Sequence, residues 1–140
     1  MNQPATGRTL PAYCSRLKTE RANKLYVQIL DLLVSEKLYR DPNFTTRELA
    51  EALHTNTRYV SAAVAISTGG NYSALINNLR LRDACKMLVS PRYAKLTAEE
   101  IGLLSGYSSR QAFYLAFSRV HDCTPREYRQ QRQESAGRKP

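Results

Sequence analysis

Two short clusters of hydrogen-bonding side chains recur along the chain. The first is Asn56-Thr57-Arg58, with Ser61 one helical turn later, and the second is Ser109-Arg110-Gln111. A guanidinium group donates a planar pair of hydrogen bonds, and a glutamine amide both donates and accepts. Such groups recognise the flat edges of nucleic-acid bases, as in Arg–guanine and Gln–adenine pairs.

The other reactive residue types form no catalytic or metal-binding pattern. Cys14, Cys85 and Cys123 are widely separated and lack a Cys-x-x-Cys spacing, and the two histidines are His54 and His121. A zinc site and a disulfide framework are therefore not expected. Without a nucleophile motif or a glycine-rich phosphate loop, the sequence predicts no enzyme activity and no bound cofactor or metal.

The composition favours an anionic partner. The chain of 140 residues has 21 Lys and Arg against 12 Asp and Glu, a net charge of +9. Nucleic acid is the commonest partner of a small basic protein. Since 42% of the residues are hydrophobic, one domain or two small lobes can bury a core. No signal-peptide pattern and no apolar run near the roughly 20 residues that span a bilayer is present, so we expect a cytoplasmic protein with no membrane partner.

Helical periodicity runs through most of the chain, and no segment alternates like a strand. Residues 1–19 carry scattered basic residues without a period and are predicted to be a flexible basic arm. Residues 134–140 are predicted to be a flexible tail. Between these ends the sequence predicts an all-α domain over residues 20–133, with a first helix over about residues 20–39.

A helix-turn-helix pattern follows, and it occurs twice. Capping boxes at residues 45–48 and 97–100 open short helices. Asn56 and Ser108, 52 residues apart, are then predicted to cap the second helices, with Gln111 in the reciprocal capping position of the later one. In such a pair the second helix can enter the major groove of DNA by its N-terminal end.

Residues 73–88 form a helix between the two patterns that is apolar nearly all round, which predicts a connector buried on both sides. The two lobes cover about residues 20–72 and 89–133, and the second closes with a helix from Pro125. If the connector holds the recognition helices parallel, they would lie about 34 Å apart, one turn along B-DNA.

Several stretches resemble the DNA-binding domain of AraC/XylS-type transcription regulators. They are Glu48-Leu49-Ala50, Arg58-Tyr59-Val60-Ser61, Leu79-Arg80-Leu81-x-x-Ala84, Ile101, Gly106-Tyr107-Ser108-Ser109, Phe113, Phe117 and Thr124-Pro125-x-x-Tyr128-Arg129. The resemblance spans about residues 39–130 and is more specific in the second half. It implies seven helices in two helix-turn-helix lobes joined by a buried connector helix, and sequence-specific binding to double-stranded promoter DNA.

The outward faces of the two second helices carry the predicted base-reading side chains. They are Asn56, Thr57, Arg58, Ser61 and Ala62 in the first lobe, and Ser109, Arg110, Gln111, Tyr114 and Leu115 in the second. The core face of the later helix is predicted to consist of Phe113, Ala116, Phe117 and Val120. Phosphate contacts, which position a protein without reading sequence, are predicted for Arg47, Arg92, Lys95, Arg119 and Arg126.

Three positions depart from the family pattern. Ala62 and Leu115 stand where a long polar residue that reaches a base edge is frequent, and neither can donate a hydrogen bond. Leu115 and Tyr114 are able to pack on thymine methyl groups or to cover a protein partner. His54 occupies a turn position where glycine is usual, and it is predicted to be a surface residue.

Two other classes of function stay open. One is a protein-interaction module on the same fold with weak or non-specific DNA binding, and the other is nucleic-acid binding without sequence preference. The first helix has three candidate partners, which are RNA polymerase, a second copy of the chain, and a sensing domain of the kind that many family members carry.

Overall fold

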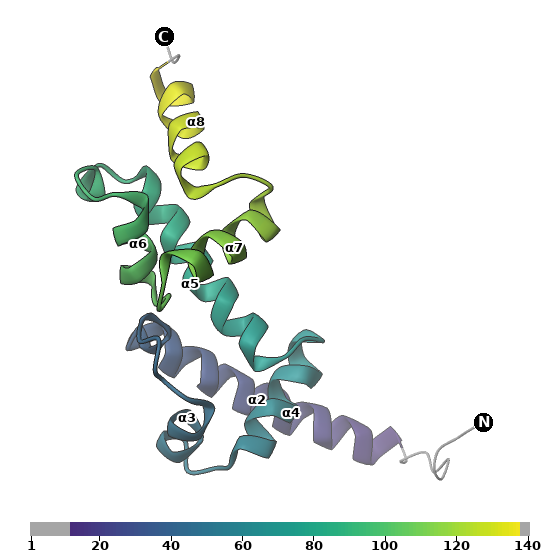
Figure 1. Ribbon diagram of the computed structural model, residues 1–140. Coiled ribbons are helices and arrows are strands. Elements are labelled where there is room, and N and C mark those ends of the chain that lie inside the picture. The colour runs from purple at the N-terminus through teal and green to yellow at the C-terminus, as the bar shows by residue number, and fades with distance from the viewer. Residues whose placement is uncertain (1–11, 138–140) are drawn as a thin grey trace. The chain divides into compact units, whose positions relative to one another are not determined.

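The computed structural model describes residues 12–137, and these residues form seven α-helices and no strand (Figure 1). The helices are α2 (Ala12–Ser35), α3 (Thr46–Ala52), α4 (Thr57–Thr68), α5 (Tyr72–Val89), α6 (Ala98–Ser105), α7 (Arg110–His121) and α8 (Pro125–Gly137). Two 3-10 turns, η1 (Leu38–Arg40) and η2 (Pro91–Tyr93), follow α2 and α5. The all-α prediction is confirmed. None of these helices is long and apolar enough to cross a membrane.

The helices group into two compact units. Unit 1 comprises the described residues 12–31 and 46–72, and it contains most of α2 together with α3 and α4. Unit 2 comprises residues 32–45 and 73–137, and it contains α5 from Ser73 onward with α6, α7 and α8. The sequence places residues 32–45 in the first lobe, whereas the structure groups them with unit 2.

Two charged residues of α5 hold the turn after α2 within unit 2. Arg80 donates from Nε to the carbonyl of Tyr39 at 2.7 Å and from Nη2 to the carbonyl of Asp41 at 3.3 Å. Asp83 accepts from the Tyr39 hydroxyl at 2.8 Å and from Arg40 Nε at 2.6 Å. Burial opposes the charge of Asp83, but the bonds from Arg40 and Tyr39 prevail and lower its pKa. These long-range bonds explain why the turn belongs to unit 2.

Both ends of the domain are more helical than the sequence predicts. Helix α2 begins at Ala12, inside the predicted flexible arm of residues 1–19, and residues 1–11 lie outside the described residues. Helix α8 continues to Gly137, inside the predicted tail of residues 134–140, and residues 138–140 lie outside the described residues. A nucleated helix gains one hydrogen bond for each residue added, so it continues until a breaker intervenes.

Each unit buries the inward face of its second helix. Val60, Ala63 and Val64 of α4 are buried in unit 1, and Phe113 and Phe117 of α7 are fully buried in unit 2. The other buried hydrophobic residues of the unit 2 core are Leu81, Ala84, Met87, Leu88, Ala98, Ile101 and Tyr107. The predicted core positions of the two second helices are therefore confirmed for these residues.

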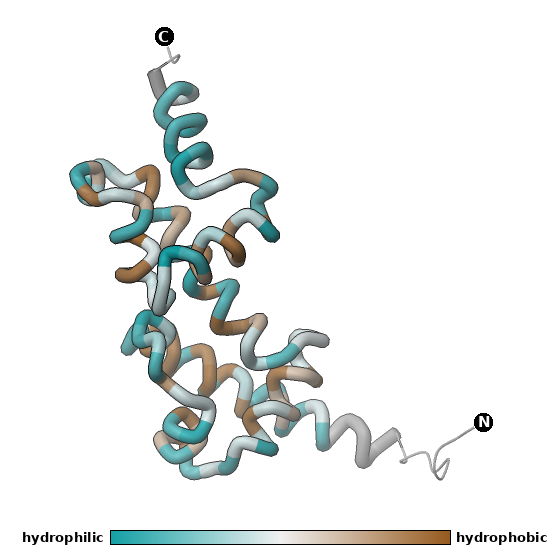
Figure 2. Tube along the Cα trace, viewed as in Figure 1, coloured by the Kyte–Doolittle hydropathy of each residue, from teal (hydrophilic) through white to brown (hydrophobic). Residues whose placement is uncertain are grey.

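Helix α8 is attached by its first two turns. Figure 2 shows it as mostly hydrophilic, in contrast with α5 and α7. Pro125 is fully buried, and the ring of Tyr128 packs edge-on against Phe117 with centroids 5.4 Å apart. Arg129 then donates to three main-chain carbonyls, those of Leu88 at 2.9 Å, Leu96 at 2.6 Å and Tyr93 at 3.1 Å. These bonds tie α8 to the end of α5 and to the η2 segment.

Helices α6 and α7 approach each other through a glycine. A Cβ atom added to Gly102 of α6 would lie only 2.3 Å from Cδ2 of the Phe113 ring. The ring is fully buried and also contacts Tyr107, with centroids 5.3 Å apart, so it has little room to move. The absence of a side chain at residue 102 therefore sets how close the two helices come.

Replacing Gly102 by alanine tests this constraint. Alanine favours a helix over glycine by about 1 kcal/mol, but overpacking a core costs about 1–3 kcal/mol. Because the Phe113 ring is enclosed, we expect the overpacking to prevail and Gly102→Ala to lower the free energy of unfolding by about 1–2 kcal/mol. Urea denaturation followed by circular dichroism measures the change.

Leu103→Ala is the control on the same helix. Leu103 is 54% exposed, and a surface substitution of this kind stays within about 0.5 kcal/mol of the unaltered protein. An increase in stability for Gly102→Ala would show that α6 and α7 can separate to accept the methyl group.

Candidate DNA-binding surfaces

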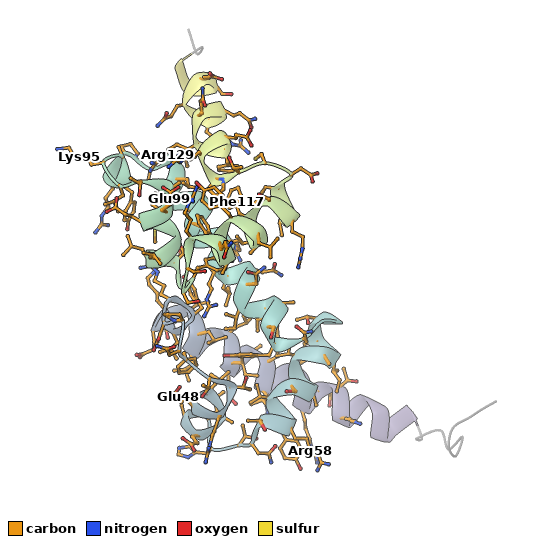
Figure 3. All side chains as sticks on the ribbon, in the orientation of Figure 1. Glu48, Arg58, Lys95, Glu99, Phe117 and Arg129 are labelled. Atoms are coloured by element: carbon orange, nitrogen blue, oxygen red, sulfur yellow. The ribbon has the colours of Figure 1, made fainter. Side chains whose placement is uncertain are left out.

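The first candidate surface is the start of α4. The Asn56 side-chain oxygen accepts from the backbone N–H of Tyr59 at 2.9 Å, which confirms Asn56 as the cap. That oxygen is therefore committed to the helix, and the Asn56 amide NH₂ is the group left to face a ligand. Thr57, Arg58 and Ser61 are exposed. Figure 3 labels Arg58 at the start of this helix.

Ala62 does not lie on that exposed face. It is half-buried and lines a hollow of about 580 Å³ between α2 and α4, together with Tyr59, Ala63 and Ile66. Residues three and four apart share one side of a helix, and this side of α4 faces α2. The prediction that Ala62 points outward is therefore wrong.

The second candidate surface is the start of α7, and its cap is Ser109 rather than Ser108. The Ser109 hydroxyl accepts from the backbone N–H of Ala112 at 3.1 Å, and α7 begins at Arg110. Ala112 thus takes the position that Gln111 was predicted to fill. Gln111 is exposed and is not needed for the cap, which leaves its whole amide for a ligand.

The shifted cap reveals that the second turn is one residue longer than the first. His54, with φ 57°, and Gly106, with φ 117°, are the left-handed residues of the two turns and stand 52 positions apart. The caps Asn56 and Ser109 stand 53 positions apart. A left-handed conformation strains any residue with a Cβ atom, so His54 accepts a strain that Gly106 avoids.

The same shift relates the two recognition helices, each of 12 residues. Val60 and Phe113 are both fully buried and stand 53 positions apart, as do Val64 and Phe117. In this register Thr57 corresponds to Arg110 and Arg58 to Gln111. The helices therefore present different polar groups at equivalent positions.

Two apolar expectations on α7 need correction or refinement. Val120 was predicted to face the core, but it is 55% exposed because it lies at the solvent side of the last turn. Ala116 is half-buried against the core cluster. Leu115 is 63% exposed, as the outward face requires.

Tyr114 is held within the unit instead of facing outward freely. It is half-buried, its ring packs edge-on against Phe113 with centroids 6.1 Å apart, and its hydroxyl donates to Glu99 Oε2 at 2.6 Å. Its hydroxyl is thus occupied by a carboxylate of α6. The hydroxyl is therefore not available to a ligand, and the packing of the Tyr114 ring on thymine methyl groups or on a protein partner stays a prediction.

Glu99 brings together residues from the first turns of three helices. Besides the Tyr114 hydroxyl, its Oε2 atom pairs with Arg126 Nη2 of α8 at 3.1 Å and with Arg110 Nε of α7 at 3.4 Å. The guanidinium of Arg110 also lies over the Tyr114 ring, 4.9 Å from its centroid. We call Glu99, Arg110, Tyr114 and Arg126 the Glu99 cluster.

The cluster stabilises the charged form of its carboxylate. The hydrogen bond from Tyr114 is the largest influence, and with the Glu99 backbone amide and Arg126 it outweighs partial burial and lowers the pKa of Glu99 to about 2. Burial and the same hydrogen bond raise the pKa of Tyr114. At neutral pH the carboxylate is therefore fully ionised and the phenol is neutral.

The predicted phosphate contacts lie in different surroundings. Arg126 belongs to the Glu99 cluster, and Arg47 pairs with Glu51 at 3.7 Å on the exposed side of α3. Arg92 lies over the ring of Tyr93 at 5.7 Å. Lys95 and Arg119 are exposed, and Arg119 lines a hollow with Leu115 beside α7.

Glu99 is not among the DNA-binding residues that the sequence predicts. It stands next to Glu100, whose capping-box bonds to Thr97 were predicted and are confirmed at 2.8 and 3.1 Å. An acidic residue in the first turn of a helix is usual because of the helix dipole, so the residue type of Glu99 did not mark it as part of a site.

Among the described residues, no group of His, Cys, Asp or Glu side chains is arranged to hold a metal ion.

We expect Glu99 to make the free energy of unfolding depend on pH in the acidic range. The pKa of Glu99 is about 2 in the folded state, against an ordinary value of 4.5 for a glutamate. Its contribution to the stability of the fold is therefore complete above about pH 4.5 and is lost as pH falls toward 2. We expect the difference in free energy of unfolding between the unaltered protein and Glu99→Gln to shrink over this range. Urea denaturation at pH 7, 4.5 and 3 measures it, and a difference that is constant with pH would contradict the assigned cause.

Comparison with known proteins places this geometry in a family. A family model described as a helix-turn-helix domain matches residues 49–131, more than half of the chain. The xylose operon regulatory protein of Escherichia coli (strain K12) is 38% identical over 61 residues, which make up 44% of this chain and 15% of that protein. The chain thus spans a small part of the length of this curated relative.

Solved structures share the fold. The C-terminal domain of the two-component response regulator yesN from Fusobacterium nucleatum subsp. nucleatum is 24% identical, with a TM-score of 0.66 over 76% of this chain and 98% of that one. A transcriptional regulator with an AraC-type DNA-binding domain from Chromobacterium violaceum is 24% identical, with a TM-score of 0.61 over 86% of this chain and 96% of that one. With the family match and the paired helix-turn-helix units, the chain belongs to the AraC/XylS family of transcription regulators, of which it carries the DNA-binding domain.

Proposed function

We propose that this protein is a sequence-specific regulator of transcription that binds double-stranded promoter DNA and inserts α4 and α7 into adjacent major-groove segments. The proposal goes beyond the family's general role in two respects, the reading of sequence and the use of both helices. It requires no cofactor and no catalysis. RNA polymerase, a second copy of the chain and a sensing domain are candidate partners of α2.

The observation that carries the proposal is the repeated design of the two recognition helices. Each has 12 residues, each is capped at its N-terminus by a polar side chain, and each fixes its inward face with two fully buried residues 4 positions apart. Polar donors are exposed in the first turn of both helices. A major groove admits a helix in this orientation, with its N-terminal residues against the bases.

The polar groups in these first turns suit different bases. Arg58 and Arg110 can each offer a pair of donors to guanine, and Gln111 can pair with adenine. Each well-formed pair discriminates against a wrong base by roughly 1–3 kcal/mol. Arg119, Arg126 and the other predicted phosphate contacts would add affinity that does not depend on sequence.

A second candidate function is a protein-interaction module on the same fold. It is favoured by Leu115, which is 63% exposed on the helix that would read DNA. An exposed apolar side chain at this position also suits contact with the methyl group of thymine, so Leu115 is compatible with DNA binding as well. The two functions differ in whether the protein prefers particular duplexes.

Selection from random duplex DNA, followed by titration at several salt concentrations, tests the proposed function. We expect enrichment of a bipartite motif whose half-sites lie about 10 base pairs apart, one turn of B-DNA. Affinity should fall steeply with salt because phosphate contacts release counterions. Equal affinity for all duplexes would refute sequence-specific binding and favour the protein-interaction module or general nucleic-acid binding.

Single substitutions separate base contacts from phosphate contacts. Arg110→Ala should relax the preference at one half-site at a cost of roughly 1–3 kcal/mol for the preferred base. Arg119→Ala should weaken binding to all duplexes about equally and reduce the salt slope by about 1. Titration of each variant against the selected duplex and against single-base variants of it measures both effects.

Arg58→Ala is the matched comparison in unit 1. It should relax the preference at the half-site that Arg110→Ala leaves intact. If Arg110→Ala and Arg119→Ala changed binding in the same way, the assigned roles of these arginines would be wrong.

A further inference from the structure

The Glu99 cluster joins a residue proposed to read bases to a residue that does not touch DNA in that proposal. Glu99 is half-buried, with 20% of its side chain exposed, whereas the Arg110 side chain paired with it is 66% exposed. The acidic partner of the pair is therefore much less exposed than the guanidinium. A carboxylate placed in this way can restrain an arginine side chain while leaving its guanidinium group exposed to a ligand.

We propose that Glu99 is a positioning residue that determines the sequence specificity of unit 2 by fixing the direction of Arg110. The inference rests on the proposed function, since it needs α7 to read DNA. Glu99 itself would make no contact with a base.

Two restraints act on Arg110 from different helices. Its Nε atom is paired with Glu99 of α6 at 3.4 Å, and its guanidinium plane lies over the ring of Tyr114, 4.9 Å from the centroid. Pairing through Nε uses one edge of the guanidinium and leaves the terminal nitrogens at the exposed end. Those terminal nitrogens form the fork that guanine accepts.

Tyr114 is itself fixed, so the support is rigid. Its hydroxyl donates to Glu99 at 2.6 Å, and its ring packs against Phe113, which is fully buried. A free arginine side chain loses up to about 2 kcal/mol of rotamer entropy when it is immobilised. An arginine that is already restrained loses less on binding, and the gain is confined to a base placed where the fork points.

The charge of Glu99 has the opposite effect on DNA of unrelated sequence. A carboxylate beside Arg110 and Arg126 reduces their attraction for phosphates, whichever bases follow. Arg126 is held by Glu99 at 3.1 Å and would be released if that charge were removed. Glu99 is therefore expected to raise the affinity for the preferred sequence and to lower the affinity for unrelated DNA, and both changes increase the ratio of specific to non-specific affinity.

The described positions of unit 1 that correspond to Glu99 and Tyr114 carry other residues. The position 52 residues before Glu99 is Arg47, which pairs with Glu51 instead, and the position that corresponds to Tyr114 is Ser61. The flanking capping residues match, since Thr45 and Glu48 stand 52 residues before Thr97 and Glu100. The specific contribution of Glu99 should consequently be confined to the half-site bound by unit 2.

The test compares Glu99→Gln with Glu134→Gln in the full chain. Both changes remove one negative charge from unit 2, but Glu134 is an exposed residue of α8 outside the cluster. Binding is titrated against the selected duplex, against duplexes with single changes in either half-site, and against a random duplex. For Glu99→Gln we expect discrimination at the unit 2 half-site to fall roughly tenfold, within the range of one bidentate contact.

Affinity for the random duplex should rise for Glu99→Gln, with a salt slope that is steeper by up to about 1. Discrimination at the unit 1 half-site should not change. Glu134→Gln should leave discrimination at both half-sites as in the unaltered protein. A purely structural role for Glu99 would instead weaken binding to the selected and random duplexes together, and that result would overturn the proposal.

Tyr114→Phe provides a second variant that keeps both the ring and the carboxylate charge. It removes only the hydroxyl donor, so we expect a smaller loss of discrimination at the unit 2 half-site and no gain in affinity for the random duplex. If Glu99→Gln does not fold, as judged by circular dichroism, this variant decides the question. Unchanged discrimination in Tyr114→Phe would then overturn the proposal.

Failure of the proposed function has a different signature. If the unaltered protein shows no preference among duplexes, sequence-specific binding is refuted and this inference falls with it. If the unaltered protein has a preference and Glu99→Gln retains all of it, only the role of Glu99 is refuted.

Discussion

The close approach of α6 and α7 is the constraint on which unit 2 depends. A helix without a side chain at Gly102 lets the Phe113 ring lie against its backbone, and Phe117 extends the same buried face one turn further. Because interiors are close-packed, this contact fixes the rotation of α7 about its own axis. That rotation in turn decides which residues of α7 face solvent, so the packing of two phenylalanines selects the candidate DNA-binding face.

Polar bonds then stabilise what the apolar core has arranged. Arg129 of α8 and Arg80 and Asp83 of α5 bond to segments that are distant in sequence, and they hold the η2 segment and the turn after α2. Glu99 acts at the N-terminal end of α6, where it pairs with residues near the starts of α7 and α8. A structural carboxylate and a candidate DNA contact thus form an ion pair, which links the stability of the unit to the proposed readout of DNA.

Local signals in the sequence account for most of the fold. The Thr97 capping box, the Asn56 cap and the start of α8 at Pro125 depend on side chains within four residues of each other, and short-range chemistry of this kind can be recognised in a sequence. Predictions were less accurate where two neighbouring residues could equally cap a helix, as with Ser108 and Ser109 before α7. They also differ from the structure for residues 32–45, whose bonds are made to residues about 40 positions away.

The sequence by itself determined the all-α class, the repeated helix-turn-helix units and most of the buried face of each recognition helix, because helical periodicity and capping are local. The family was indicated by the resemblance of its motifs. Only the tertiary structure decided the surroundings of the polar residues on the other face. It placed Ala62 toward α2, exposed Val120, hydrogen-bonded Tyr114 to Glu99 and brought Arg110 into an ion pair with the same carboxylate. Those contacts join side chains from different helices, and their partners depend on how the helices pack and not on spacing along the chain.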